Sequence, residues 1–155
     1  MSISNLFVPN DLNLYAESLN LPNGSTGAAG DLNYYEQYNI VAALGGIWAT
    51  NQSCTIDITR IGNQVTFMLQ TDILATATTA STIQLVLSGG IPARFRPVTD
   101  IHAACVIENN AAITSSGVLL ISAAGILQVS NTGGTNFTGS GLSGVFGFAV
   151  NYLTS

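Results

Sequence analysis

The feature that most constrains this chain is an alternation of apolar and polar residues in short runs that end at turn residues. Apolar residues take alternate positions in residues 54–59 and again in 65–70, and the intervening residues 60–63 include Gly62 and Asn63. Alternation with a period of two places the apolar side chains on one face of a strand. Two such runs joined by a Gly- and Asn-containing turn predict a β-hairpin.

The same pattern recurs at short spacing along the rest of the chain, and helical periodicity is weak throughout. We expect further strands at residues 83–87 and 101–108, and a second hairpin over 117–130 that turns at 123–125. Pro92 and Pro97 exclude residues 89–99 from a central strand, so this segment is predicted to be a loop. The pattern predicts an antiparallel all-β sandwich of about eight to ten strands.

Charge is scarce and negative. Only 7% of the residues are charged, Lys is absent, and three Arg face eight acidic residues, which gives a formal net charge of −5. This balance opposes binding to nucleic acids and to anionic membranes, both of which attract basic proteins. Ser, Thr and Asn supply 44 of the 155 residues and are expected to cover the surface.

The chain divides by composition into two parts. Residues 1–37 contain Pro9, Pro22 and several Gly but little alternation, so we expect an N-terminal arm or junction to a stalk there. Residues 38–155 are expected to form a single globular head. We predict neither a cleavable secretory signal nor a membrane-spanning helix, because no run of about 18 apolar residues occurs.

The C-terminal third carries a signal for self-association. No acidic or basic side chain follows Glu108. In the predicted strand 145–153, one face carries bulky side chains, and the other carries small or neutral ones. Because loss of charge is typical of subunit interfaces, we predict a homo-oligomer. A neutral surface rich in Ser and Thr is the alternative interpretation. The predicted interface residues are Val145, Gly147, Ala149, Asn151 and Leu153.

Several short motifs carry a resemblance to a known family. The strand Phe146-Gly147-Phe148-Ala149-Val150, preceded by Asn136-Phe137-Thr138-Gly139, resembles the closing strand of trimeric jelly-roll heads of the complement and tumour-necrosis-factor type. The string 91–97 (Ile-Pro-Ala-Arg-Phe-Arg-Pro), the hairpin 117–127 and the segment 58–66 are similar to the C-terminal heads of viral and phage fibre proteins. The resemblance spans about residues 38–153, and it carries over no receptor or calcium residue.

The resemblance implies a homotrimeric, tumour-necrosis-factor-like jelly roll at the tip of a fibre or collagen-like stalk. Such a head promotes trimerisation of the fibre and attaches to a host cell-surface glycan or protein, so its place would be the virion surface or the extracellular space. One alternative is a structural trimerisation or minor capsid protein without receptor binding. Another is a bacterial lectin-like adhesin.

Catalytic and metal-binding interpretations are weaker. Asp100 and His102 lie two residues apart and would need a Ser to form a hydrolase triad, but no Gly-X-Ser-X-Gly motif is present, so a structural or interface His102 is favoured. Three copies of His102 around a threefold axis would create a metal-binding or pH-sensitive cluster. Asp57 and Asp72 could pair as in a glycosidase, but solvated acids explain them better. We expect no enzymatic activity, no cofactor and no metal.

Candidate receptor-binding residues are few. Arg94 and Arg96 flank Phe95 and could bind sialylated or uronic glycans through paired hydrogen bonds. The favoured alternative is that they brace the loop by pairing with acids such as Asp100 or Asp72. An exposed Trp48 would be a sugar-stacking platform, although a buried Trp is commoner. The two cysteines, Cys54 and Cys105, could form a disulfide or remain as buried thiols.

Overall fold

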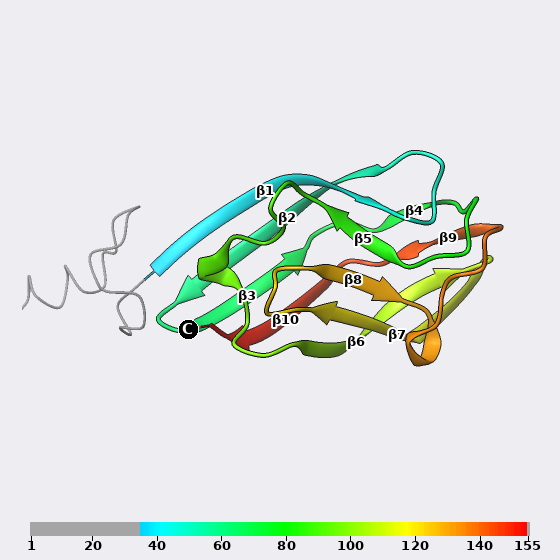
Figure 1. Cartoon of the computed structure of the whole chain (residues 1–155). Coiled ribbons are helices and arrows are strands. Elements are labelled where there is room, and N and C mark those ends of the chain that lie inside the picture. The colour runs from blue at the N-terminus through cyan, green and yellow to red at the C-terminus, as the bar shows by residue number, and fades with distance from the viewer. Residues whose placement is uncertain (1–34, 155) are drawn as a thin grey trace, which may run out of the picture.

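The computed structural model describes residues 35–154, which form ten antiparallel β-strands with two short 3-10 helices between them (Figure 1). The prediction of an antiparallel all-β domain is therefore confirmed. The strands are β1 (Tyr35–Gly45), β2 (Gln52–Ile61), β3 (Gln64–Leu69), β4 (Ile73–Thr76), β5 (Ile83–Val86), β6 (Ile101–Asn109), β7 (Ala112–Ile121), β8 (Leu127–Ser130), β9 (Leu142–Val145) and β10 (Phe148–Leu153), and the helices are η2 (Ala93–Phe95) and η3 (Thr132–Gly134).

The first predicted hairpin is present as β2 and β3. The turn between them is formed by Gly62 and Asn63, and Gly62 has a φ of 57°, a backbone conformation that glycine adopts without steric cost. The register pairs Ile58 with Phe67, and both side chains are buried. The alternation in the sequence thus gives the face of each strand correctly.

The second predicted hairpin is present as β7 and β8, and the predicted loop 89–99 contains only η2. Strand β7 begins at Ala112, earlier than the alternation indicates, because it also forms a hairpin with β6. That hairpin turns at Asn110 and Ala111, both with positive φ and neither a glycine. Residues 35–45, 73–76 and 142–145 are strands that the sequence pattern did not reveal.

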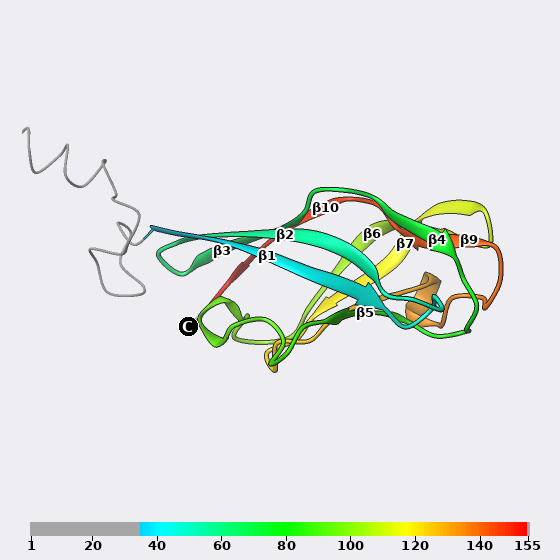
Figure 2. The ribbon, with the colours of Figure 1, turned by 90° about the horizontal axis from the view of Figure 1, so that it is seen from above.

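The sheet closes on itself through two bent strands. Its order is β10-β3-β2-β1-β5-β8-β7-β6-β9-β4. Strand β3 continues into β4 after three residues, and β9 continues into β10 after two, so the two ends of the order are extensions of inner strands. Leu69 pairs with Phe148 on one side of the bend, and Ile73 pairs with Val145 on the other. Figure 2 shows β9 and β10 following one another along the molecule.

The closed sheet contains two Greek keys. Strand β5 returns beside β1 after the consecutive strands β1, β2 and β3, and β9 returns beside β6 after β6, β7 and β8. Jelly rolls are also built from two Greek keys. One hydrophobic core fills the inside of the closed sheet, and its members include Ile56, Phe67, Ile107 and Val129.

The bend between β9 and β10 corrects one sequence prediction. Two residues, Phe146 and Gly147, lie opposite three residues of the other bent strand, 70–72, so the inward and outward positions exchange at this point. Val145 is therefore fully buried in the core and does not lie on the outer face where the sequence analysis placed it. The other four predicted interface residues do face outward from β10 or the bend before it.

The predicted N-terminal arm, residues 1–37, lies outside the described residues except for its last three. Residues 35–37 form the start of β1, so the arm does not extend to residue 37 as a separate element. Within residues 35–154, no helix combines the length and the apolar character that crossing a membrane requires.

Candidate functional site

The most distinctive surface is the outer side of four adjacent strands, which we call the neutral face. Inward positions of β2, β3 and β10 are buried, so the intervening residues point outward. Asp57 is the single carboxylate among them, and the rest are amides, hydroxyls or apolar groups. The neutral face consists of Tyr35, Gln37, Asn39, Val41, Thr55, Asp57, Thr59, Ile61, Gln64, Thr66, Met68, Ala149, Asn151 and Leu153.

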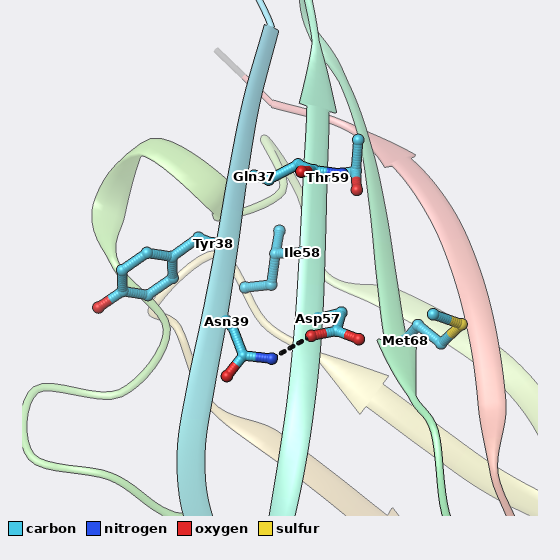
Figure 3. Close-up of a pocket in the computed structure, with 7 residues that line it drawn as sticks. All are labelled: Gln37, Tyr38, Asn39, Asp57, Ile58, Thr59 and Met68. Atoms are coloured by element: carbon cyan, nitrogen blue, oxygen red, sulfur yellow. Dashed lines mark hydrogen bonds between the residues drawn. The ribbon is translucent and has the colours of Figure 1, made fainter. Parts of the chain in front are cut away.

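A shallow depression of about 350 Å³ lies on the β1–β2–β3 part of the neutral face. Its polar lining comes from Gln37, Asn39, Asp57 and Thr59, and Met68 closes one side (Figure 3). Figure 3 shows Asn39 and Asp57 pointing toward one another from neighbouring strands. The remaining lining residues are Ile58 and Tyr38, and the Tyr38 ring points away from the Asn39–Asp57 pair.

Hydrogen bonds hold the Asp57 carboxylate in place. The side-chain amide of Asn39 donates to Oδ1 of Asp57, and that of Gln70 donates to Oδ2. These groups come from β1, β2 and the residue after β3, because the register places Asn39 opposite Asp57 and Asp57 opposite Met68. On the next row, the Thr66 hydroxyl donates to Oδ1 of Asn151 at 2.6 Å. The neutral face therefore carries an ordered set of polar groups.

Arg94 is held against β1. Its Nε donates to Oε1 of Glu36 at 2.7 Å, and its guanidinium lies 4.6 Å from the ring centre of Phe95 and 5.1 Å from that of Tyr38. The Tyr38 and Phe95 rings stack with their centres 5.5 Å apart. Because 47% of the Arg94 side chain is exposed, we assign the ion pair no more than about 1 kcal/mol.

Arg96 braces its own loop. Its Nε donates to the carbonyl oxygen of Ile91 at 2.6 Å, and its Nη2 donates to that of Gly89 at 3.0 Å. The prediction that the two arginines brace the loop is confirmed, but their partners are Glu36 and backbone carbonyls where Asp100 or Asp72 was expected. A role of Arg94 and Arg96 in receptor binding stays a prediction.

Trp48 is buried, with 6% of its surface exposed. Its indole Nε1 donates to the carbonyl oxygens of Ala75 and Ser143, each at 3.1 Å. It therefore joins the loop after β1 to β4 and β9, and it offers no exposed ring on which a sugar could stack. The alternative interpretation of a structural Trp48 is the one that the geometry supports.

The candidate catalytic carboxylates have structural partners. Oδ1 of Asp100 accepts a hydrogen bond from the backbone N–H of Ala123 at 2.8 Å, so it caps the β7–β8 turn and does not orient His102, which is exposed on β6. Oδ1 of Asp72 accepts from the N–H of Gly147 at 2.9 Å, inside the bend that closes the sheet. Between Tyr35 and Thr154, no group of three or more His, Cys, Asp or Glu side chains is arranged to hold a metal ion.

Both cysteines are free and buried, which confirms the thiol interpretation over a disulfide. Burial raises the pKa of the Cys105 thiol to about 11 and also raises that of Cys54, because a thiolate loses its hydration inside the protein. Neither cysteine is therefore a reactive thiolate at neutral pH.

The sequence analysis missed the residues that form the depression, apart from Asp57. Gln37, Asn39, Thr59 and Met68 come from three strands, and only the register of the sheet brings them together. The signal in the sequence was Asp57 itself, a lone charge at an outward position of an alternating run.

Comparison with known proteins finds one curated relative that aligns over nearly the whole chain. The chain is 27% identical over 185 aligned residues to "Structural protein V8" of the Sputnik virophage, and the alignment covers 99% of this chain and 100% of that protein. No protein-family model matches the sequence.

Among solved structures, the fold is comparable to the reovirus attachment protein sigma1, whose structure was determined in complex with alpha-2,3-sialyllactose. The TM-score is 0.44 at 12% sequence identity, with 77% of this chain and 65% of the sigma1 chain covered, so the chain spans just under two thirds of that protein. The comparisons together show a chain that is similar along its whole length to a viral structural protein.

Proposed function

We propose that this chain is a component of a virus particle that forms a homotrimeric, jelly-roll-type head at the particle surface and attaches the particle to its host cell. The observation that carries the proposal is the similarity to the virophage structural protein, which extends over 99% of this chain and all of that relative. The closed all-β domain is a stable carrier for exposed loops and faces, as attachment requires.

The neutral face supports the trimeric part of the proposal. On β10, Ala149, Asn151 and Leu153 present small or uncharged side chains, and Leu153 is 65% exposed. An uncharged outer face with exposed apolar groups is typical of surfaces that pack against another subunit. In the proposed trimer these residues, together with Gly147, form the subunit contact.

Trimerisation would also serve attachment. Three copies on one head can engage a cell surface together, so a weak single site is sufficient for a firm hold on the cell. The proposed function needs no catalytic residue, cofactor or metal. The partners are the host receptor, which is a glycan or a protein, and the remainder of the fibre.

A structural role without receptor binding is the second candidate. It is favoured by the name of the relative, which describes a structural protein and states nothing about a receptor. In that role the same trimer would stabilise the particle or nucleate a stalk, and the outer faces would contact other particle proteins.

Adsorption distinguishes the two candidates. The purified full chain, labelled with a fluorophore, is added to cells of the host in which the particle multiplies, and adsorption of particles is then measured with and without an excess of unlabelled chain. Attachment predicts saturable binding of the chain and reduced adsorption of particles. If the chain is present in particles by mass spectrometry but neither binds cells nor competes, the structural role is the correct one.

A further inference from the structure

The positive charges of this chain are committed to its own fold. The sequence contains no Lys, and its three Arg all lie in the described part. Arg60 is 1% exposed and donates to the carbonyl oxygens of Gly62 and Arg94. Arg96 donates to two carbonyl oxygens of its loop, and Arg94 pairs with Glu36. A ligand carrying a carboxylate or sulfate would have to compete with these contacts for a cation.

The depression on the neutral face offers the opposite chemistry. The Asp57 carboxylate is an acceptor whose position is fixed by the amides of Asn39 and Gln70. Carboxylate oxygens have more than one lone pair each, so Asp57 can accept further hydrogen bonds. The Gln37 amide and the Thr59 hydroxyl stand on the adjacent row and can both donate and accept.

This combination suits a ligand with many hydroxyl groups and no charge. Each sugar hydroxyl both donates and accepts, and a hydroxyl that donates to a carboxylate forms a charge-assisted hydrogen bond. Met68 and Ile58 supply apolar surface for the C–H side of a sugar ring. The same Asp57 charge, on a chain of net charge −5, repels carboxylated or sulfated ligands. A volume of about 350 Å³ lies within the usual range for small-ligand sites.

We propose that this depression binds an uncharged glycan, with Asp57, Asn39, Gln37 and Thr59 as the groups that recognise its hydroxyls. The proposal rests on the proposed attachment function and specifies its receptor class. It also places the site beside the proposed subunit contact, because the register runs Asn39, Asp57, Met68 and Ala149 across four neighbouring strands. A contact centred on β10 therefore leaves the β1–β2 depression at its margin.

The test uses the purified full chain on an array that carries neutral, sialylated and sulfated glycans. The original chain is expected to bind neutral glycans and to bind no sialylated or sulfated glycan more strongly than its neutral parent. Binding is also expected to change little between 50 and 500 mM salt, since an uncharged ligand is not screened. Preference for an anionic glycan overturns the proposal.

Two variants locate the site. Asp57→Asn removes the charge at constant size, and Gln37→Ala removes an exposed amide; each is expected to weaken neutral-glycan binding by about tenfold or more, the factor that corresponds to about 1.4 kcal/mol. Gln84→Ala is the matched control, because Gln84 is an exposed amide at an outward position of β5, outside the neutral face. Binding by this control is expected to stay within twofold of the original chain.

The melting temperature and solution mass of each variant show whether fold and assembly are retained. If folded Asp57→Asn and Gln37→Ala proteins bind glycans and cells as well as the original chain, the inference fails and the attachment function stands. If the original chain binds no glycan but binds cells through a protease-sensitive receptor, the inference again fails alone. If the chain binds neither glycans nor cells and does not compete with particles, the attachment function fails as well.

Discussion

Ala111 occupies a backbone conformation that alanine rarely adopts. Residues 110 and 111 form the two-residue loop between β6 and β7, and their φ values are 53° and 62°. Hairpin loops of this length require positive φ at both central residues when the turn is of type I′, and Gly or Asn usually fills them. Asn110 fits that rule, whereas the Cβ of Ala111 is strained by about 1–2 kcal/mol.

Ala111→Gly is therefore expected to stabilise the protein. Removing the Cβ relieves the strain but adds backbone freedom to the unfolded chain, so the net gain in the free energy of unfolding is about 1 kcal/mol. Urea unfolding followed by fluorescence measures it. Ala104→Gly, on the outward side of β6, is the control and should lose about 0.5–1 kcal/mol. Equal losses at both positions would show that the turn does not impose positive φ on residue 111.

Among the elements, the bent pairs β3–β4 and β9–β10 determine whether the sheet closes. Gly144 on β9 passes so near β4 that a Cβ there would lie 1.9 Å from the carbonyl oxygen of Ile73. Real Cβ atoms do not approach oxygen this closely, so either strand would have to move. At Gly147, in the bend, the atom nearest to an added Cβ would be the carbonyl oxygen of Leu69, at 3.0 Å.

Gly144→Ala is accordingly expected to lower the free energy of unfolding by about 2–3 kcal/mol, the upper part of the range for overpacked sites, because it separates β4 from β9. Gly147→Ala is the matched comparison, and its loss should be about 1 kcal/mol or less. Chemical denaturation of the two variants side by side makes the measurement. A Gly147 variant that is the less stable of the two would contradict the assignment of the closest approach to the β4–β9 pair.

These elements also show what the sequence could predict. Alternation gave the hairpin β2–β3 and the inward residues of β10, because a local period of two decides which side chains are buried. Alternation could not place Val145, since the exchange of faces depends on an extra residue in a partner strand more than 70 positions away. The strand at 35–45 was missed because the Gly- and Pro-rich stretch before it has no alternation, and the boundary was set too late.

The candidate site was less predictable than the fold, for a related reason. Sequence proximity correctly indicated that Arg94 and Arg96 brace their loop, but it favoured acids nearby in the chain, and the ion pair of Arg94 is with Glu36, 58 positions earlier. The groups around Asp57 lie on separate strands, so their association depends on the register and not on spacing along the chain.

For the whole molecule, the proposed trimer makes a prediction about mass. Light scattering on a sizing column should give 48.0 kDa for the chain, three times its 16.0 kDa. Leu153→Asp places a carboxylate in the proposed contact, where desolvation is unfavourable, and should shift the protein to 16.0 kDa with its fold retained. Val86→Asp is the control, because Val86 is also an exposed apolar residue, 49% accessible, on a strand outside the neutral face.

Two results would count against this contact. If the original chain is a monomer at 16.0 kDa, the neutral face is a surface of a single subunit or a contact with other particle proteins. If the chain is a trimer and Val86→Asp dissociates it while Leu153→Asp does not, the subunits meet through the other outer face of the closed sheet.

The closing pair of strands also has a consequence for how the chain is made. During synthesis on the ribosome, β3, β4 and β6 emerge well before β9 and β10, the strands that pair with them. Until those last strands leave the exit tunnel, the edges of β3 and β6 are open to pairing with any other nascent chain. Translation that stops before residue 142 therefore yields a product with two exposed edges, and chaperones and proteases would have to remove it before it aggregates.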